Sequence, residues 1–304
     1  ILVGDKSSLE KELDRCGGKK SERLDLHHSE SVIAMDAKPA AILRRGRDSS
    51  LWKSFELVAN GDAQACISGG NTGALMIVGV KLLGMLPGIQ RPALMAYVPN
   101  VNSYTGLLDL GVNLNVDAHQ LVQFAVMGSV TAELVEGVDN PRVGLLNVGH
   151  EDSKGHDLVR EAQAMLRELP LNYTGFIEGH DIFAGTVDVA VCDGFAGNLI
   201  LKSSEGVARM LMGEIRSAFN RDVKSRIGGL LARESLGQTL ARLDPAAHNG
   251  APLLGLNGVA VKSHGGSDVK GMTRAIVEAG REARKQVPSR IEASIHQYHL
   301  ESQS

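Results

Sequence analysis

Short apolar runs recur along the chain, and each gives way to a polar, glycine-containing stretch and then to apolar residues at helical spacing. The clearest case begins with Val187–Val191, a run rich in β-branched residues that predicts a buried strand. The glycine-rich heptapeptide 192–198 follows, and residues 199–211 show helical spacing. This order predicts an α/β protein whose glycine turn lies at the carboxyl end of a strand, where ligands bind. The N–H groups that open the helix would favour an anion.

The same succession of features returns at residues 65–74, 143–155 and 259–267, and a similar acid–glycine–amide loop spans 109–113. Carboxyl ends of parallel strands meet at one edge of a sheet. We therefore expect a single sheet edge to carry the loops that follow Ser68, Asp109, Val148, Asp193 and His264.

The rest of the pattern is simpler. It predicts strands at 92–98 and 104–110, separate helices at 118–128 and 129–135, and a last helix at 269–286. Pro288 should end that last helix, and the tail beyond it should be loosely held.

Residues 205–243 form the longest amphipathic pattern in the chain. Apolar residues from Val207 to Leu231 recur every fourth position, and basic residues such as Arg226, Arg233 and Arg242 flank them. Gly228-Gly229 would be a hinge between two helices. Two interpretations stay open: a helix pair packed on the sheet or on a second subunit, or an amphipathic arm that touches a membrane surface.

Composition narrows the class of protein. With 304 residues, 43% hydrophobic and 22% charged, the chain is typical of a globular protein with a large core. A net charge of −3 and only 4% aromatic residues argue against a nucleic-acid partner. Three cysteines do not make a disulfide framework and indicate a reducing compartment. No cysteine or histidine cluster has metal-ligand spacing, and no apolar run is long enough to span a bilayer.

Several motifs in fixed order resemble the phosphate acyltransferases of bacterial phospholipid synthesis, the PlsX family. The resemblance covers nearly the whole chain, most clearly from Asp36 to Ile291. The motifs that carry it are SGGNTGAL (68–75), RPAL (91–94), LDLGVN (108–113), LVQFAVMGSV (121–130), GHEDSKG (149–155), VCDGFAGNLILKSSEG (191–206), NGAPLLGL (249–256) and KSHGGSD (262–268). The chain departs from the family at Gly70, where alanine is usual, near Val112, where alanine is usual, and at His150, where a second acid is usual.

The resemblance implies a three-layer α/β/α fold with a mostly parallel sheet, like that of isocitrate and isopropylmalate dehydrogenases, and a protruding helical hairpin within 205–243. Residues 1–304 would form one α/β domain of two subdomains that share a cleft. The family opens with a strand and a glycine-rich segment that this sequence does not contain, so we expect native residues ahead of Ile1.

The resemblance also implies a reaction and partners. Acyl-[acyl carrier protein] and inorganic phosphate would give acyl phosphate and free carrier protein, without a cofactor or metal ion. The protein would be a cytoplasmic homodimer, peripherally associated with an anionic membrane surface through residues 205–243. A glycerol-3-phosphate acyltransferase that consumes the product is a further possible partner.

The residues at the loops suit this chemistry. A phosphate oxygen must attack a thioester carbonyl, and the developing oxyanion needs donors. Asn71, Asn198, Lys154 and His264 are the candidate catalytic residues. The alternative for Lys154 is an ordinary surface lysine at a helix start, which is disfavoured because a cation is unfavourable there. The candidate phosphate- or substrate-binding residues are Ser68, Gly69, Gly70, Thr72, Gly73, Asp109, Asn113, Asp193, Gly194, Gly197 and Gly265.

Two other function classes stay open. A nicotinamide-dependent dehydrogenase of similar fold is disfavoured because no G-x-G-x-x-G with a following acid occurs in a βαβ unit. A non-catalytic protein that binds acyl phosphate or carrier protein in the same cleft would be distinguished from the enzyme by the absence of turnover.

Overall fold

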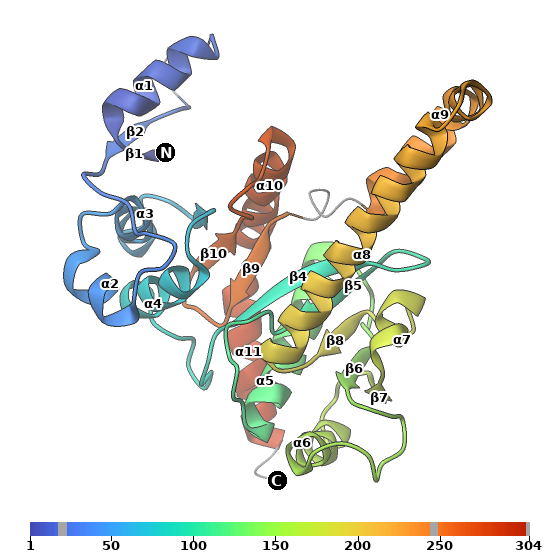
Figure 1. Ribbon diagram of the computed structural model, residues 1–304. Helices are drawn as coiled ribbons and strands as arrows, with labels where there is room; N and C mark the ends of the chain where they lie inside the picture. The colour runs from blue at the N-terminus through green and yellow to red at the C-terminus, as the bar shows by residue number, and fades with distance from the viewer. Residues whose placement is uncertain (18–22, 244–248, 302–304) are drawn as a thin grey trace.

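The computed structural model describes residues 1–17, 23–243 and 249–301. Its centre is an eight-stranded sheet with the order β3-β10-β9-β4-β5-β8-β6-β7 (Figure 1). In that order, the strands are Ala65–Ser68, Val259–Lys262, Ala251–Leu254, Ala93–Pro99, Tyr104–Leu108, Val189–Val191, Val143–Leu146 and Tyr173–Ile177. Parallel pairs form both ends of the sheet, and β9 and β4 introduce antiparallel pairs in its middle. The predicted α/β class is confirmed.

Strand direction reverses across the middle of the sheet. β10 is antiparallel to β9, β9 to β4, and β4 to β5. Because three reversals separate β10 from β5, strands β3 and β10 run opposite to β5, β8, β6 and β7. The loops after Ser68 and His264 therefore lie at one edge, and those after Asp109, Val148 and Asp193 at the other. The prediction of a single edge is wrong.

Helices cover both faces of the sheet and make the three layers. One face packs against α5 (Ala118–Thr131), α6 (Asp157–Arg167) and α11 (Val287–Glu301), and the other against α3 (Ser50–Ala59), α4 (Thr72–Leu82), α7 (Gly179–Ala184) and the start of α8. Leu108 belongs to the first core and its neighbour Leu107 to the second, as expected when successive strand residues face opposite sides. α10 (Val269–Arg284) covers β3 and β10, and α2 (Pro39–Arg45) packs beside α4.

Two helix predictions need correction. Residues 118–136 form one continuous rod, α5 followed by the π-helical turn η1 (Ala132–Glu136), which ends at Gly137 with a left-handed φ of 71°. The described part of the tail after Pro288, up to residue 301, is not loosely held. It forms α11, whose Val287, Ile291 and Ile295 are buried against α5, because proline is compatible with the first turn of a new helix.

The first residues form a small separate unit. β1 (Leu2–Gly4) and β2 (Leu26–His28) pair in parallel, with α1 (Lys6–Arg15) packed on them. In Figure 1 this unit stands at one end of the molecule, beyond α3.

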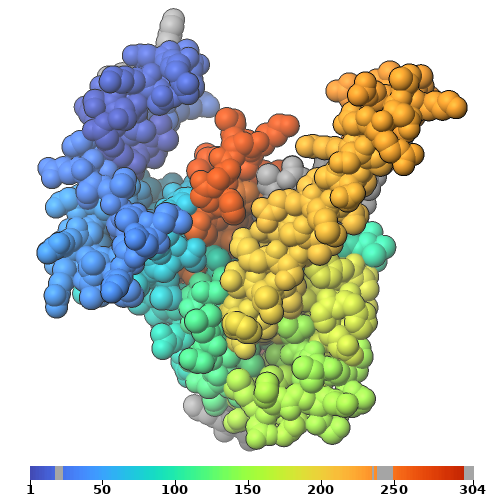
Figure 2. All heavy atoms as spheres, viewed as in Figure 1, coloured from blue at the N-terminus to red at the C-terminus, as the bar shows by residue number. Residues whose placement is uncertain are grey.

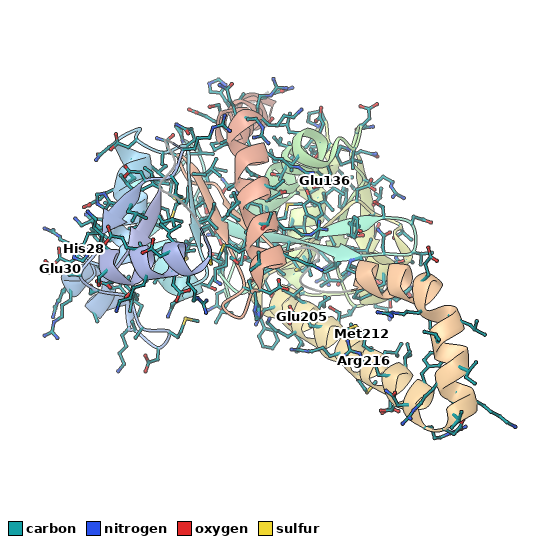
Figure 3. All side chains as sticks on the ribbon, turned by 90° about the horizontal axis from the view of Figure 1, so that it is seen from above. His28, Glu30, Glu136, Glu205, Met212 and Arg216 are labelled. Carbon is teal, nitrogen blue, oxygen red and sulfur yellow. The ribbon has the colours of Figure 1, made fainter. Side chains whose placement is uncertain are left out.

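A helical arm projects from the body of the protein. α8 (Gly194–Asn220) leaves the sheet and α9 (Val223–Leu243) returns beside it, so that the pair stands clear of the other elements (Figures 1 and 2). From above, Glu205, Met212 and Arg216 follow one another outward along α8 (Figure 3). The predicted hinge at Gly228-Gly229 is wrong. The chain turns between α8 and α9, and Gly229 lies against the Phe219 ring, where a Cβ would come within 2.9 Å.

Many of the described apolar side chains of the arm lie at its surface. In α8 only Gly194 and Gly197 are buried, and Leu230 and Leu231 of α9 are 69% and 82% exposed. The first turns of α8, with Ala196, Ile200 and Leu201, pack on the sheet, and the arm beyond them leaves it. Among the residues that the structure describes, no helix has the length and apolar character needed to cross a membrane.

Candidate active site

The first group of predicted residues surrounds Asp109, at the end of β5. Its carboxylate is fully buried and accepts four hydrogen bonds, from the N–H groups of Leu94, Leu110 and Asn113 and from the Asn113 side chain, at 2.6–3.0 Å. Burial raises the pKa of Asp109, while these donors oppose the rise. Because both oxygens are occupied, Asp109 holds the loop together and has no free site for a substrate.

Asn113 has a similar structural task. Its amide donates to the Pro92 carbonyl at 2.8 Å and to Asp109, so both of its N–H groups are used. The loops after β5 and β8 lie against each other here. A Cβ at Gly197 would lie 1.9 Å from the Asp109 carbonyl oxygen, so only glycine permits this approach.

Backbone N–H groups at the start of α8 are used in hydrogen bonds within the protein. Asp193 is its N-cap and accepts from the Ala196 N–H at 2.7 Å, while the Gly194 N–H donates to the Asn113 carbonyl at 2.7 Å. The Asp193 carboxylate offsets part of the positive end of the α8 dipole. An anion at this helix start would therefore have to approach the Asp193 carboxylate. The side chain of Asn198, one turn further, is exposed and makes no hydrogen bond with any residue that the structure describes.

The second group lies at the opposite edge, where the loops after β3 and β10 touch. The Ser263 N–H donates to the Ser68 carbonyl at 2.9 Å, and a Cβ at Gly265 would lie 3.2 Å from the Gly69 carbonyl oxygen. The Gly70 N–H donates to the Ser68 hydroxyl at 3.1 Å. The structure therefore brings together Ser68, Gly69, Gly70 and Gly265, with Thr72 and Gly73 opening α4 beside them.

Asn71 is the N-cap of α4. Its side-chain oxygen accepts from the Ala74 N–H at 2.9 Å, and its amide donates to the Met35 carbonyl. Because this cap is neutral, it leaves the positive end of the α4 dipole uncompensated, unlike Asp193 at α8. Asn71 therefore forms the anion-attracting start of α4, while its own amide is already hydrogen-bonded to the Met35 carbonyl.

His264 is exposed at the tip of the β10 loop. Its Nδ1 accepts from the Gly266 N–H at 3.1 Å, so the neutral ring carries its proton on Nε2 and presents a donor. Asn249, which the motif NGAPLLGL contains but which was not a candidate, supports this loop. Its side chain accepts from the His264 N–H at 2.7 Å and donates to the Ser263 hydroxyl at 2.7 Å.

Lys154 lies in a third loop, after β6. The Asn147 amide donates to the carbonyls of Gly149 and Lys154, at 3.1 and 3.2 Å, and fixes the loop's shape. Gly155 completes it with a left-handed φ of 84°. The Lys154 side chain is exposed and pairs with no acid among the described residues, whereas nearby Asp152 is held by Gln163 and Arg167.

One cation near the second group escaped the sequence prediction. Lys262 ends β10 beside Ser68 in the sheet register, so the two side chains leave the same face of the sheet. Its ammonium donates to the Ser263 carbonyl and pairs with no described acid. Burial, and secondarily the charge of Lys202 on α8, lower the pKa of Lys262. The motif KSHGGSD contains this lysine, but the sequence analysis did not include it among the candidates.

α8 connects the two edges. Asn198 and Lys202 are four residues apart and so share a helix face. Asn198 lies against Gly111 of the first group, where a Cβ on that glycine would meet it at 3.4 Å, while Lys202 acts on Lys262 of the second group. No hydrogen bond among the described residues joins the two groups directly, nor either group to the Lys154 side chain.

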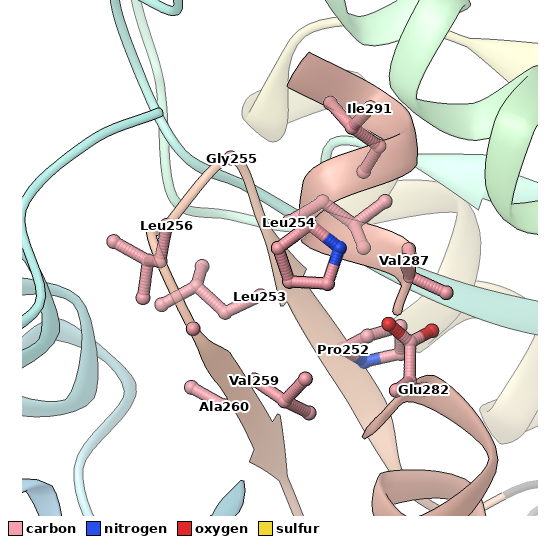
Figure 4. A pocket seen from close by; sticks show the side chains of 12 residues that line it. Pro252, Leu253, Leu254, Gly255, Leu256, Val259, Ala260, Glu282, Val287 and Ile291 are labelled. Carbon is pink, nitrogen blue, oxygen red and sulfur yellow. The ribbon is translucent and has the colours of Figure 1, made fainter. Parts of the chain in front are cut away.

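The arrangement favours an anionic ligand near Lys262. A half-buried ammonium without a carboxylate partner is costly in the protein alone, and an anion would compensate it. The cavity between β9, β10 and α11 is a different feature. It measures about 10 Å³, is lined by apolar residues and Glu282, and has room for about one water molecule (Figure 4).

Comparisons with known proteins agree with the motifs. A family model described as "Fatty acid synthesis protein" matches residues 1–290. A phosphate acyltransferase of Alkalilimnicola ehrlichii is 50% identical over 292 residues, which cover 96% of this chain and 85% of that protein. A phosphate acyltransferase of Caulobacter vibrioides is 47% identical over 97% of this chain and 82% of its own length.

Solved structures support the fold alone. A phosphotransacetylase from Streptococcus pyogenes aligns with a TM-score of 0.61 at 18% identity, over 93% of this chain and 85% of that one. The EutD phosphotransacetylase from Staphylococcus aureus aligns with a TM-score of 0.59 at 15% identity, over 94% and 86%. The three-layer architecture is therefore one that phosphotransacetylases share.

Proposed function

The chain belongs to the phosphate acyltransferase family, and we propose that it converts acyl-[acyl carrier protein] and inorganic phosphate into acyl phosphate and free carrier protein. A phosphate oxygen attacks the thioester carbonyl carbon, the C–S bond breaks, and the carrier leaves as a thiolate that takes up a proton. The thiolate is a good leaving group, so the protein must mainly hold phosphate and stabilise the oxyanion.

We propose that phosphate binds beside Lys262, between the Ser68 and His264 loops and the first turns of α8. The observation that carries this assignment is the half-buried Lys262 ammonium, which has no described acid partner. Ser68 and the uncompensated start of α4 add donors on the same side. Lys202, which pairs with Glu205 at 3.0 Å, adds a second cation. The glycines at 69, 70, 73 and 265 keep this space free of side chains.

The acyl group would then lie toward α8. The exposed Asn198 amide is the donor best placed to meet the oxyanion, since nothing described in the protein occupies it. The His264 Nε2–H is a donor for phosphate or for the leaving sulfur. Lys154, unpaired with any described acid, would supply charge to the phosphate or oxyanion once the substrates are bound. Asp109, Asn113, Asp193, Gly194 and Gly197 would position this helix and not touch the substrates.

The test is phosphate-dependent release of the carrier thiol. Purified protein, acyl-[acyl carrier protein] and phosphate should release free thiol in proportion to acyl phosphate formed, and omission of phosphate should abolish release. Lys262→Met should raise the apparent KM for phosphate at least tenfold, with Lys81→Met, an exposed lysine on α4, as the matched control. Thiol release without phosphate, or none at all, would contradict the function; a normal KM in Lys262→Met would contradict only the assignment of Lys262.

The rival classes predict different results in the same assay. A protein that only binds acyl phosphate or carrier protein would show no turnover. A nicotinamide-dependent dehydrogenase would change NADH fluorescence on binding, which we do not expect here.

The cellular setting is also a proposal. Acyl phosphate carries an apolar acyl chain, and a membrane enzyme such as a glycerol-3-phosphate acyltransferase would consume it. A cytoplasmic protein held at the inner membrane surface would therefore shorten its path. The exposed apolar side chains of the arm support such contact. α10 has a second exposed apolar face, formed by Val269, Met272 and Ile276, which supports the proposed homodimer.

A further inference from the structure

Two loops outside the proposed substrate site bring two histidines and two carboxylates together. His150 follows β6, and Glu178, His180 and Asp181 open α7 after β7. One ring nitrogen of each histidine and one Asp181 oxygen all lie within 4.8 Å of one another. Ligand atoms about 2.0–2.2 Å from a tetrahedral ion lie about 3.3–3.6 Å from each other, so small side-chain movements would bring these three atoms onto one ion.

The orientation of His150 is fixed by the backbone. Its Nδ1 lies 3.0 Å from the Phe176 carbonyl oxygen, which only accepts, so Nδ1 carries a hydrogen. In the neutral ring, Nε2 then presents a lone pair. That atom faces two carboxylates, with Asp181 Oδ2 at 3.4 Å and Glu178 Oε1 at 3.7 Å. A lone pair that faces two carboxylates is electrostatically unfavourable, and a proton or a metal ion between them would compensate it.

The second histidine approaches from the other side. His180 Nε2 lies 3.7 Å from Asp181 Oδ1, and its ring stands at 86° to that of His150 with 6.3 Å between the ring centres. Asp181 is 7% exposed, so water screens its charge poorly. No lysine or arginine of the described residues pairs with Glu178 or Asp181; their ion-pair partners are these two histidines.

We propose that His150, His180 and Asp181 bind one divalent transition-metal ion of the Zn²⁺ type. Two imidazoles and a carboxylate suit Zn²⁺ or Co²⁺ better than Mg²⁺ or Ca²⁺, which prefer oxygen ligands alone. The Phe176 carbonyl orients His150, and the Glu178 N–H donates to Asp181 Oδ2 at 2.8 Å, as outer partners do in metal sites. Water or Glu178 would fill the fourth position.

Such an ion would join the start of α7 to the loop that carries Lys154. The loop begins at Asn147 and His150 lies within it, four residues before Lys154. The ion would therefore restrain this loop without taking part in the proposed chemistry.

The experiment measures metal binding directly. The full chain carrying Cys16→Ser, which removes the one exposed thiol of the described residues, is freed of metal and titrated with Zn²⁺ by calorimetry near pH 7.5. A parallel titration with Co²⁺ is followed by visible absorption, which reports the coordination geometry. We expect one ion per chain. His150→Ala and His180→Ala should each weaken binding at least tenfold, and His119→Ala, an exposed histidine on α5, should not.

The outcomes separate the metal from the alternatives. Circular dichroism of each metal-free variant establishes that it is folded, and His180→Asn gives a milder change if His180→Ala is not. Absence of saturable binding would overturn the proposal, as would equal binding by His150→Ala and His119→Ala. A His150 ring that titrates by NMR identically with and without Zn²⁺ would show that a proton alone fills the cluster, which also overturns it.

Discussion

Asn71 and Asn198 look alike in the sequence, since each stands in a glycine loop before a helix, yet their surroundings differ. Asn71 caps α4 and donates to the Met35 carbonyl, whereas the Asn198 side chain is exposed on α8 with no hydrogen bond to a described residue. An engaged amide stabilises the protein, and a free one is available to a substrate. The two residues should therefore respond differently to the same substitution.

Asn198→Ala should reduce turnover about 10²-fold with no loss of stability, as for removal of an oxyanion donor. Asn71→Ala should cost about 1 kcal/mol of stability, the usual effect of losing an N-cap. Urea unfolding and the thiol-release assay on both variants measure this difference. Asn71→Ser, which keeps a capping oxygen, is the control and should recover most of the stability. Stability lost in Asn198→Ala, with activity unchanged, would reverse the two roles.

At the residue scale, the sequence could identify the loops but not which atoms are free. Asp109 and Asn113 were candidate substrate ligands because acid–glycine–amide loops often bind ligands, and the structure occupies their polar atoms with protein partners. Lys262 was not a candidate because Lys202 on α8, whose charge acts on it, stands sixty residues earlier in the chain. The His150 cluster was invisible for the same reason, since its ligands come from two separate loops.

The arm is the element whose sequence pattern carried the most information. The periodicity predicted two helices with an apolar face, and α8 has such a face. The apolar residues of α9 are spread around the helix, with Ile227, Leu230 and Leu231 exposed. What the pattern could not locate was the turn, because Gly228-Gly229 suggests a hinge while the second glycine in fact lets α9 approach Phe219. The periodicity also could not tell whether the sheet, a second subunit or a membrane surface covers the apolar face of the arm.

The arm should bind anionic vesicles, more weakly as salt rises. Arg226, Leu230 and Arg233 share a face of α9 and are all exposed. Reversing both arginines to glutamate removes attraction of about 1 kcal/mol each, so vesicle partitioning should fall at least tenfold while turnover in solution is retained. Flotation with phosphatidylserine vesicles measures this.

The matched control reverses two exposed lysines of α1, Lys6→Glu with Lys11→Glu, and should float like the unmodified protein. Leu230→Gln tests the apolar contribution, with sedimentation to establish the oligomeric state. A Leu230→Gln protein that still floats as a folded dimer would refute membrane contact at this residue. One that no longer forms the dimer would instead assign the face to a subunit contact.

At the scale of the whole molecule, the sequence predicted the α/β class and most elements, but not how they face each other. Strand direction depends on how many antiparallel pairs separate two units, and here β9 and β4 supply them. β9 is a short run in NGAPLLGL that the pattern did not mark as a strand. One missed strand was enough to assign the loops of the two halves wrongly to one edge.

The packing of α10 on the sheet gives the whole molecule a pH-dependent stability. Glu282 is 2% exposed, and its Oε1 has no hydrogen-bond partner within the described residues. Burial, with the charge of Glu278 as a smaller cause, raises its pKa from 4.5 to about 8. Burial also raises the pKa of Glu278 to about 7, with Glu136 adding to the rise and Arg281 opposing it. The buried Tyr97 hydroxyl on β4 faces the same carboxylates.

Because the folded protein holds these protons more tightly than the unfolded chain, folding is favoured at low pH and loses stability as pH rises from about 4.5 through 8. Glu282→Gln removes that titration. It should be close to neutral near pH 5 and more stable than the unmodified protein near pH 9, by an amount on the order of a few kcal/mol. Urea unfolding at several pH values measures both. Glu161→Gln, an exposed residue of α6, should leave the pH dependence unchanged. If Glu282→Gln follows the same pH profile as the unmodified protein, the Glu282 carboxyl is already ionised in the folded state. Another group must then compensate its negative charge.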